Sequence, residues 1–182
     1  MKGILIAVIS ILTLVPVLDQ VSKWIIVKTM ELGQSVSVIP GVLNFTYIRN
    51  DGAAFGKLDN VRWLFMILSV VAIVVIGILM IKYRSRLDRV TMISLSLILS
   101  GGFSNMIDRT FYGEQIFNGT VIDFIDFCAF PQIWSYIFNI ADSAVVVGTG
   151  MLMVQMIVSE IRLYRKEKAE KAKAADIQSS EE

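Results

Sequence analysis

Residues 63–81 read WLFMILSVVAIVVIGILMI, nineteen residues in a row without a charge. A helix needs about 20 residues to cross the roughly 30 Å hydrocarbon core of a bilayer. Three other stretches are similarly apolar: residues 3–18, which continue past Asp19 to Trp24, residues 90–107 and residues 144–159. The sequence therefore predicts an all-α integral membrane protein with four transmembrane helices, over about residues 3–26, 62–81, 90–107 and 141–160.

The composition limits the chemistry that such a protein can perform. Of 182 residues 55% are hydrophobic and 18% charged, whereas about 25% of the residues of a soluble protein are charged. The net charge is +1, so no overall field attracts nucleic acid. The chain has no His and a single Cys, Cys128, which excludes a cysteine-based zinc site and removes the commonest general base. We therefore expect no metal and no cofactor, and a chemistry of carboxylates, hydroxyls, Lys or Arg.

The distribution of basic residues predicts the orientation. With both termini in the cytoplasm, the inner segments hold eleven basic and seven acidic residues, a net charge of +4, and the outer segments six and nine, a net charge of −3. Positive residues prefer the cytoplasmic side. The first apolar stretch has only Lys2 before it and ends without a small-x-small cleavage pattern, so we expect a retained helix and not a cleaved signal peptide.

One membrane domain, residues 1–161, is expected, with outer loops at 27–61 and 108–140. Residues 43–47 alternate between apolar and polar, which is typical of a strand. The second outer loop is rich in aromatic residues, which suit the membrane–water boundary. The charged tail, residues 162–182, has no apolar face, and we expect it to be disordered in the cytoplasm.

The polar residues of the spans gather at one depth. At 1.5 Å per residue, Asp19 lies about 25 Å from the cytoplasmic start of its helix. The same measure brings residues of the third and fourth spans to this level near the outer boundary: Asn105, Asp108, Arg109 and Asp142. Ionisable residues at membrane depth are costly and usually face the bundle interior with partners. This level is therefore the candidate functional site.

Each of these residues also has a structural interpretation. Asp19 and Lys23, four residues apart, could form only an intrahelical ion pair. Asp142 could simply cap the fourth helix, and Gly101 could serve helix packing. Asn105 and Arg109 share a helix face and suit a substrate's peptide backbone. Alternatively, Arg109 only neutralises Asp108 or binds a lipid phosphate.

Five segments carry these residues, and together they resemble one family. They are DQVSK at 19–23, NDGAAFG at 50–56, GGFSNMIDR at 101–109, VIDFIDF at 121–127 and FNIADS at 138–143. In this order the chain resembles the bacterial lipoprotein signal peptidases, also called signal peptidase II, over about residues 11–160. The stretch between Arg109 and Val121 looks longer than is usual in that family.

The resemblance implies an intramembrane aspartic endopeptidase that removes signal peptides from prolipoproteins. Cleavage would occur on the N-terminal side of a diacylglyceryl-modified Cys, with Asp123 and Asp142 as the catalytic pair. The implied fold adds a small extracytoplasmic β-element and a short outer helix to the four spans. The residues that would bind substrate or support the site are Asp19, Lys23, Asn50, Gly52, Gly101, Asn105, Arg109, Val121, Phe138, Asn139 and Ala141.

The implied setting is the bacterial cytoplasmic (inner) membrane, with the site at its extracytoplasmic face. The expected partners are diacylglyceryl-modified prolipoproteins and membrane lipids, without nucleic acid, and the protein is expected to be monomeric.

Chemistry is consistent with the resemblance, since two nearby carboxylates can share one proton and activate water. Which aspartate acts first as the base stays open. A different intramembrane aspartic protease would carry Gly-x-Gly-Asp, which is absent here. A small non-enzymatic transporter or assembly factor is the alternative function. It would place its carboxylates near the mid-bilayer, usually with an internal repeat.

Overall fold

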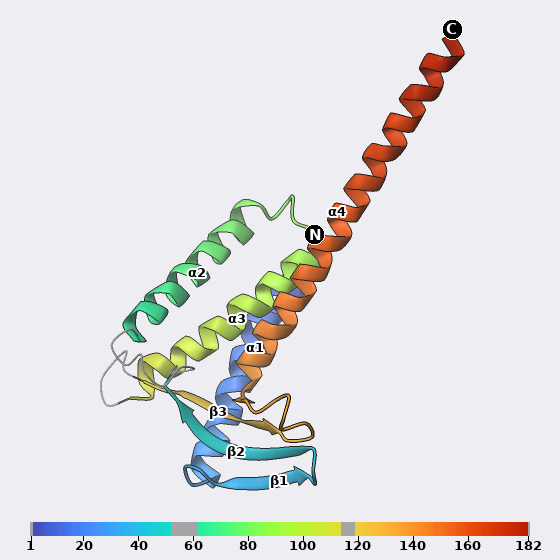
Figure 1. Ribbon diagram of the computed structural model, residues 1–182. Helices are drawn as coiled ribbons and strands as arrows, with labels where there is room; N and C mark the ends of the chain where they lie inside the picture. The colour runs from blue at the N-terminus through green and yellow to red at the C-terminus, as the bar shows by residue number, and fades with distance from the viewer. Residues whose placement is uncertain (1, 52–61, 114–118, 182) are drawn as a thin grey trace.

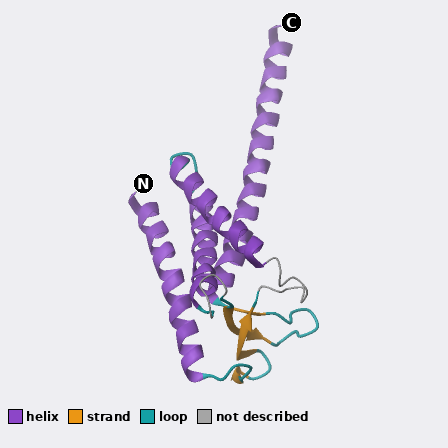
Figure 2. Ribbon diagram, turned by 90° about the vertical axis from the view of Figure 1, so that its left-hand side faces the viewer, coloured by secondary structure: helices purple, strands orange, loops and turns teal. Residues whose placement is uncertain are grey.

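The computed structural model describes residues 2–51, 62–113 and 119–181. Its elements, in chain order, are α1 (Lys2–Thr29), β1 (Ser35–Ile39), β2 (Leu43–Asn50), α2 (Arg62–Lys82), α3 (Arg89–Phe111), β3 (Val121–Phe127), β4 (Ile137–Phe138) and α4 (Ile140–Glu181). The helices lie side by side, and the strands form a small sheet at one end of them (Figure 1; Figure 2). The fold is thus mostly helical with a small antiparallel sheet.

Three helices of the described part are long and apolar enough to cross a membrane, namely Lys2–Thr29, Arg89–Phe111 and Ile140–Lys171. Within α2, residues Met66–Lys82 form a shorter apolar helix. α3 packs against all three other helices. Its contact with α4 is close, because a Cβ on Gly101 would clash with the carbonyl oxygen of Ala141. This contact confirms the packing interpretation of that glycine.

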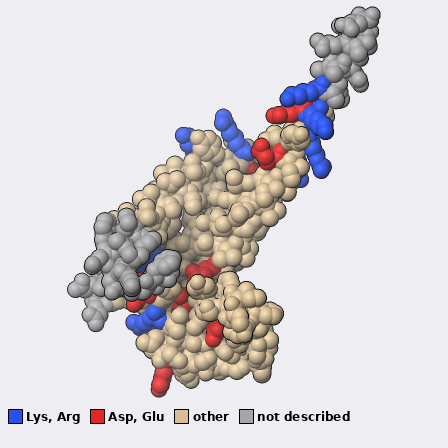
Figure 3. All heavy atoms as spheres, viewed as in Figure 1, with Lys and Arg blue, Asp and Glu red and all other residues tan. Residues whose placement is uncertain are grey.

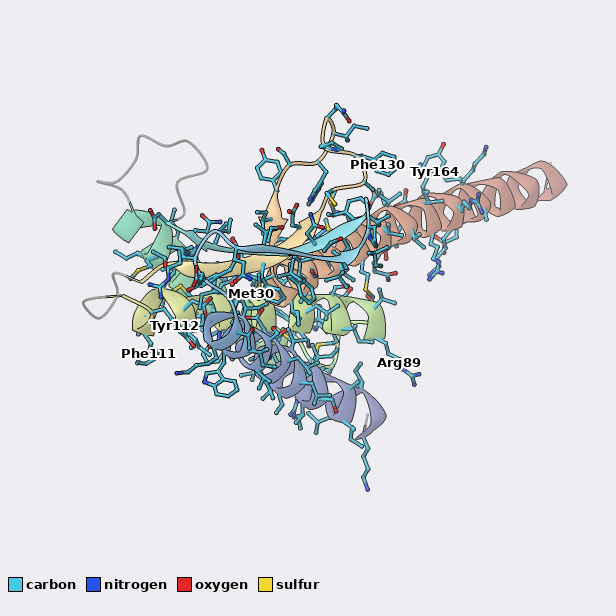
Figure 4. All side chains as sticks on the ribbon, turned by 90° about the horizontal axis from the view of Figure 1, so that it is seen from below. Met30, Arg89, Phe111, Tyr112, Phe130 and Tyr164 are labelled. Atoms are coloured by element: carbon cyan, nitrogen blue, oxygen red, sulfur yellow. The ribbon has the colours of Figure 1, made fainter. Side chains whose placement is uncertain are left out.

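The sheet has the order β1-β2-β3-β4, and every neighbouring pair is antiparallel. Ile122 and Phe124 of β3 form a buried cluster with Tyr47 of β2 and Ile26 of α1. Met30 at the end of α1 and Tyr112 at the end of α3 pack against the same cluster, while Arg89 lies at the opposite end of α3 (Figure 4). The cluster therefore fixes the sheet to the ends of α1 and α3.

Several predictions from the sequence need revision. The strand predicted at 43–47 is present and extends to Asn50. The segment around Asp123, expected as a loop, is strand β3. The tail expected to be disordered continues α4 as a helix to Glu181, because Ala, Lys and Glu are strong helix formers even without an apolar face. The described ranges hold no short outer helix.

Candidate active site

The candidate site lies where α1 and α3 end, α4 begins and β3 passes across them. Acidic side chains are visible at this junction between helices and sheet (Figure 3). Six polar side chains are buried there, and they come from α1, α3, β3 and the residue just before α4: Asp19, Lys23, Asn105, Asp108, Asp123 and Asn139. The structure thus brings together the residues that the sequence placed at one depth.

Asp123 occupies a strand position between two amide donors. Asn50 Nδ2 donates to its Oδ2 at 2.9 Å, and Asn139 Nδ2 donates to its Oδ1 at 2.6 Å. The side chain is 1% exposed. Burial, together with the nearby charge of Asp142, outweighs these two bonds and the charge of Lys23, and raises the pKa of Asp123 to about 6. This carboxyl group can therefore carry a proton at mildly acidic pH.

Asp142 lies in the first turn of α4. Asn139 caps that helix, since its Oδ1 accepts the backbone N–H of Asp142 at 2.8 Å. Asp142 returns the bond through Oδ2, which accepts the N–H of Asn139 at 3.3 Å. Such a reciprocal pair is a capping box. The capping interpretation of Asp142 is therefore correct in part, with Asn139 as the cap residue.

Asn139 and Asn105 hold the two carboxylates relative to each other. Asn139 bonds Asp123 with its side chain and Asp142 with its backbone. Asn105 donates from Nδ2 to Asp142 Oδ1 at 2.7 Å, while its Oδ1 accepts from Asn139 at 3.2 Å. Asn105 thus bonds within the site through both ends of its amide, and one of these bonds reaches Asp142. The sequence had suggested a substrate contact for it.

Lys23 lies beneath this pair and is fully buried. Its Nζ is 2.7 Å from Asp19 Oδ2 and 2.7 Å from Asp108 Oδ2, and it donates to Asn105 Oδ1 at 3.0 Å. The predicted ion pair with Asp19 is confirmed, and Lys23 forms a second ion pair with Asp108. One ammonium group therefore serves two carboxylates and the amide that holds Asp142.

The other predicted residues support the surrounding backbone. Val121 is buried and pairs with Asn50 across β2 and β3. The N–H of Ala141 donates to Asp19 Oδ1 at 2.9 Å. Phe138 in β4 stacks edge-on with Trp134.

Two predicted residues remain, Arg109 and Gly52. Arg109 is half-buried in the last turn of α3. Gly52 lies outside the described residues.

Asp126, three residues after Asp123, is separate from this site. Residues three apart in a strand point to opposite faces, and Asp126 accepts the hydroxyl of Thr46 at 2.8 Å. Among the residues described, the carboxylates and the single Cys do not form a group of three or more that could hold a metal ion. The chemistry that the described side chains offer at this site is acid–base chemistry by carboxylates.

The sequence placed Asp108 at the level of the site and offered Arg109 as its partner. In the structure Asp108 instead pairs with Lys23 and accepts Gln20 Nε2 at 2.6 Å. A signal for its place in the site was available, because Asp108 follows Asn105 by three residues and therefore shares its helix face. Ser104 was missed, and its hydroxyl donates to Asp19 Oδ2 at 2.7 Å.

Known proteins resemble this chain over most of its length. The family model described as signal peptidase (SPase) II matches residues 11–158. A lipoprotein signal peptidase of Halalkalibacterium halodurans is 45% identical over 152 residues, which are 83% of this chain and 91% of the relative.

Two solved structures, each described as a bacterial membrane enzyme studied by the in meso method, share the fold. One has a TM-score of 0.72 and 34% identity, over 84% of this chain and 88% of the other. The second has a TM-score of 0.70 and 35% identity, over 82% and 91%. The chain belongs to the signal peptidase II family and is an aspartic-type membrane peptidase.

Proposed function

We propose that this protein removes signal peptides from prolipoproteins by cutting on the N-terminal side of a diacylglyceryl-modified Cys, with Asp123 and Asp142 as the catalytic pair. One observation carries the proposal. Asn139 and Asn105 join these two carboxylates at the junction of β3 and α4. Family membership favours this activity over the transporter or assembly factor that the composition alone left open.

The two carboxylates share one proton in the working state. The ionised member takes a proton from water as the water oxygen attacks the scissile carbonyl carbon, and the protonated member donates its proton to the carbonyl oxygen. The carboxylate left ionised by this step then takes a proton back from a hydroxyl of the tetrahedral intermediate. The C–N bond breaks as the protonated carboxyl group donates its proton to the departing amine nitrogen, so the pair again holds one proton. The raised pKa of Asp123 is consistent with a shared proton near neutral pH.

The surrounding residues divide into two groups in this proposal. Asn50, Asn105 and Asn139 orient the carboxylates, because each donates to one of them. Arg109 lies on the same helix face as Asn105, one turn nearer the end of α3, where its guanidinium can hold a carbonyl of the bound signal peptide.

The charge distribution supports an orientation for the protein in the inner membrane. The loop after α2 holds Arg84 and Arg86, and basic residues continue along α4 beyond Ile161. These lie at the end of the helices opposite to the acidic junction (Figure 3). We infer four spans including α2, both termini in the cytoplasm and a site at the extracytoplasmic face beside the lipid headgroups.

We infer that the enzyme is monomeric. Light scattering of the detergent-purified protein tests this, and a dimer mass would contradict it.

The experiment that tests the function compares two substrates. Purified protein is incubated with a prolipoprotein carrying diacylglycerol on its Cys, and with the same precursor without the lipid. We expect cleavage of the lipidated precursor only, and mass spectrometry should find a product that begins with the modified Cys. Equal cleavage of both precursors, or a cut at another bond, would contradict the proposed specificity.

A further inference from the structure

The peptide group before each proposed catalytic aspartate donates to a buried carboxylate. The N–H of Ile122, next to Asp123, donates to Asp108 Oδ2 at 3.1 Å. The N–H of Ala141, next to Asp142, donates to Asp19 Oδ1 at 2.9 Å. The two catalytic residues are far apart in sequence, yet each is held in the same way by the residue that precedes it.

The places of both N–H groups in their elements explain why a side chain accepts from them. Among the described residues β4 pairs with β3 only at Ile125 and Asp126, so the edge of β3 away from β2 has no strand beside it at Ile122. Ala141 lies in the first turn of α4, where N–H groups have no partner within the helix. A buried N–H needs an acceptor, and here a carboxylate from another helix supplies it in each case.

A single ammonium group connects the two acceptors. Lys23 Nζ lies 2.7 Å from Asp19 and 2.7 Å from Asp108, and all three side chains are fully buried. Its third contact, with Asn105 Oδ1 at 3.0 Å, orients the amide that donates to Asp142. The path from Asp123 to Asp142 through Lys23 is therefore a continuous series of hydrogen bonds and ion pairs.

Further donors prevent the two carboxylates from rotating. Ser104 Oγ donates to Asp19 Oδ2 at 2.7 Å, and Gln20 Nε2 donates to Asp108 Oδ1 at 2.6 Å. Each carboxylate thus has partners on both oxygens. Because Asp19, Lys23, Ser104 and Asp108 are satisfied and fully buried, the network can hold a fixed geometry.

We propose that the Asp19–Lys23–Asp108 triad is a two-armed clamp that sets the separation of the Asp123 and Asp142 carboxylates through the N–H of Ile122 and the N–H of Ala141. Its three members are positioning residues, since they act through the backbone of the catalytic aspartates. The inference rests on the proposed function, which names the two catalytic carboxylates.

The test uses three replacements at Asp19 and at Asp108. Leu removes both the charge and the acceptor. Asn removes the charge but keeps an oxygen that can accept the N–H. Glu keeps both, but the acceptor is displaced by one methylene group, so these variants still decide the question if the Leu variants do not fold.

Turnover is measured on the lipidated precursor with equal amounts of folded enzyme. We expect the Leu variants to lose at least about a hundredfold in kcat, the scale of a misplaced catalytic group. The Asn variants should retain at least about ten times the kcat of the Leu variants, and the Glu variants should lose about tenfold. KM should change by less than about threefold in all of them. Asp126→Leu, on the same strand as Asp123, is the matched control and should stay within about threefold of wild-type kcat.

A second measurement separates positioning from general destabilisation. A non-cleavable substrate analogue with a hydroxyl at the scissile position contacts both carboxylates, so its affinity should fall in parallel with kcat. The affinity of an uncleavable analogue without the hydroxyl should not change. A purely structural role would lower the folded fraction and leave the ratio of the two affinities constant.

Three results would overturn the clamp. These are wild-type kcat in the Glu variants, equal losses in the Asn and Leu variants, or equal losses of affinity for both analogues. Failure of the proposed function would give a different result. Wild-type turnover by Asp123→Asn would contradict the assignment of the catalytic pair itself. A clamp that fails while Asp123→Asn is inactive leaves the catalytic pair in place.

Discussion

Asn139 illustrates how much a single side chain determines at this site. Its amide nitrogen bonds Asp123, its amide oxygen caps α4, and its backbone N–H bonds Asp142. A carboxylate that is buried with only a few donors has a raised pKa, and Asp123 is such a group. The hydrogen bonds of Asn50 and Asn139 lower the pKa of Asp123, and its burial raises that pKa by more.

The raised pKa of Asp123 predicts how the stability depends on pH. The pKa is about 6 in the folded protein against 3.8 ordinarily, so the folded state binds this proton more tightly than the unfolded state. The resulting stabilisation is complete below about pH 4 and is lost as the pH rises through about 6.

The comparison with Asp123→Asn tests this dependence. The melting temperature of the wild type minus that of the variant should fall as the pH rises from 4 to about 7. Asp126→Asn serves as the control for removing a carboxylate from β3. A difference that is constant with pH, or that grows as the pH rises, would contradict the account.

At the level of elements, the periodic and apolar patterns predicted the helices well, and tertiary contacts decided the rest. The strand at Leu43 was visible as alternation, but β3 was not, because VIDFIDF places apolar residues on both faces. The Asp123 side chain of β3 is buried and bonds Asn139 at the start of α4. No local sequence pattern predicts such a contact. The tail forms a helix through its intrinsic propensity, which the sequence analysis set aside for lack of an apolar face.

The sequence predicted most of the residues that belong to the site, but few of the hydrogen bonds and ion pairs that join them. The depth of Asp19 and Asn105 along their helices indicated one level, and the structure places them there. The helix face that Asp108 shares with Asn105 indicated a place in the site, but its partner could not be read from the sequence, since which of two neighbouring cations a carboxylate pairs with depends on how α3 is rotated against α1. In the structure Lys23 is the cation at 2.7 Å.

At the scale of the whole molecule, the two ends of the helices differ in their charged groups. Basic side chains, with some acidic ones among them, gather at the end of the helices away from the sheet, and the acidic site lies at the sheet (Figure 3). Since positive residues are retained in the cytoplasm, this arrangement supports the proposal that the site lies at the outer surface of the membrane.

Labelling of single cysteines checks the orientation. In a background with Cys128→Ser, the variant Ser37→Cys should react with a membrane-impermeant reagent in cells with an intact inner membrane, because β1 is exposed at the sheet. The variant Ser85→Cys, in the basic loop between α2 and α3, should react only after the membrane is permeabilised. The reverse pattern would place the sheet in the cytoplasm and exclude the proposed substrate.

The most direct measurement for the central claim is turnover by Asp123→Asn and Asp142→Asn. Each replacement should lower cleavage of the lipidated precursor by at least about a hundredfold, because one member of the pair can then no longer exchange a proton. Both variants should fold, and Asp126→Asn should stay within about threefold of the wild type. Near wild-type turnover by either catalytic variant, at equal folded content, would contradict the account.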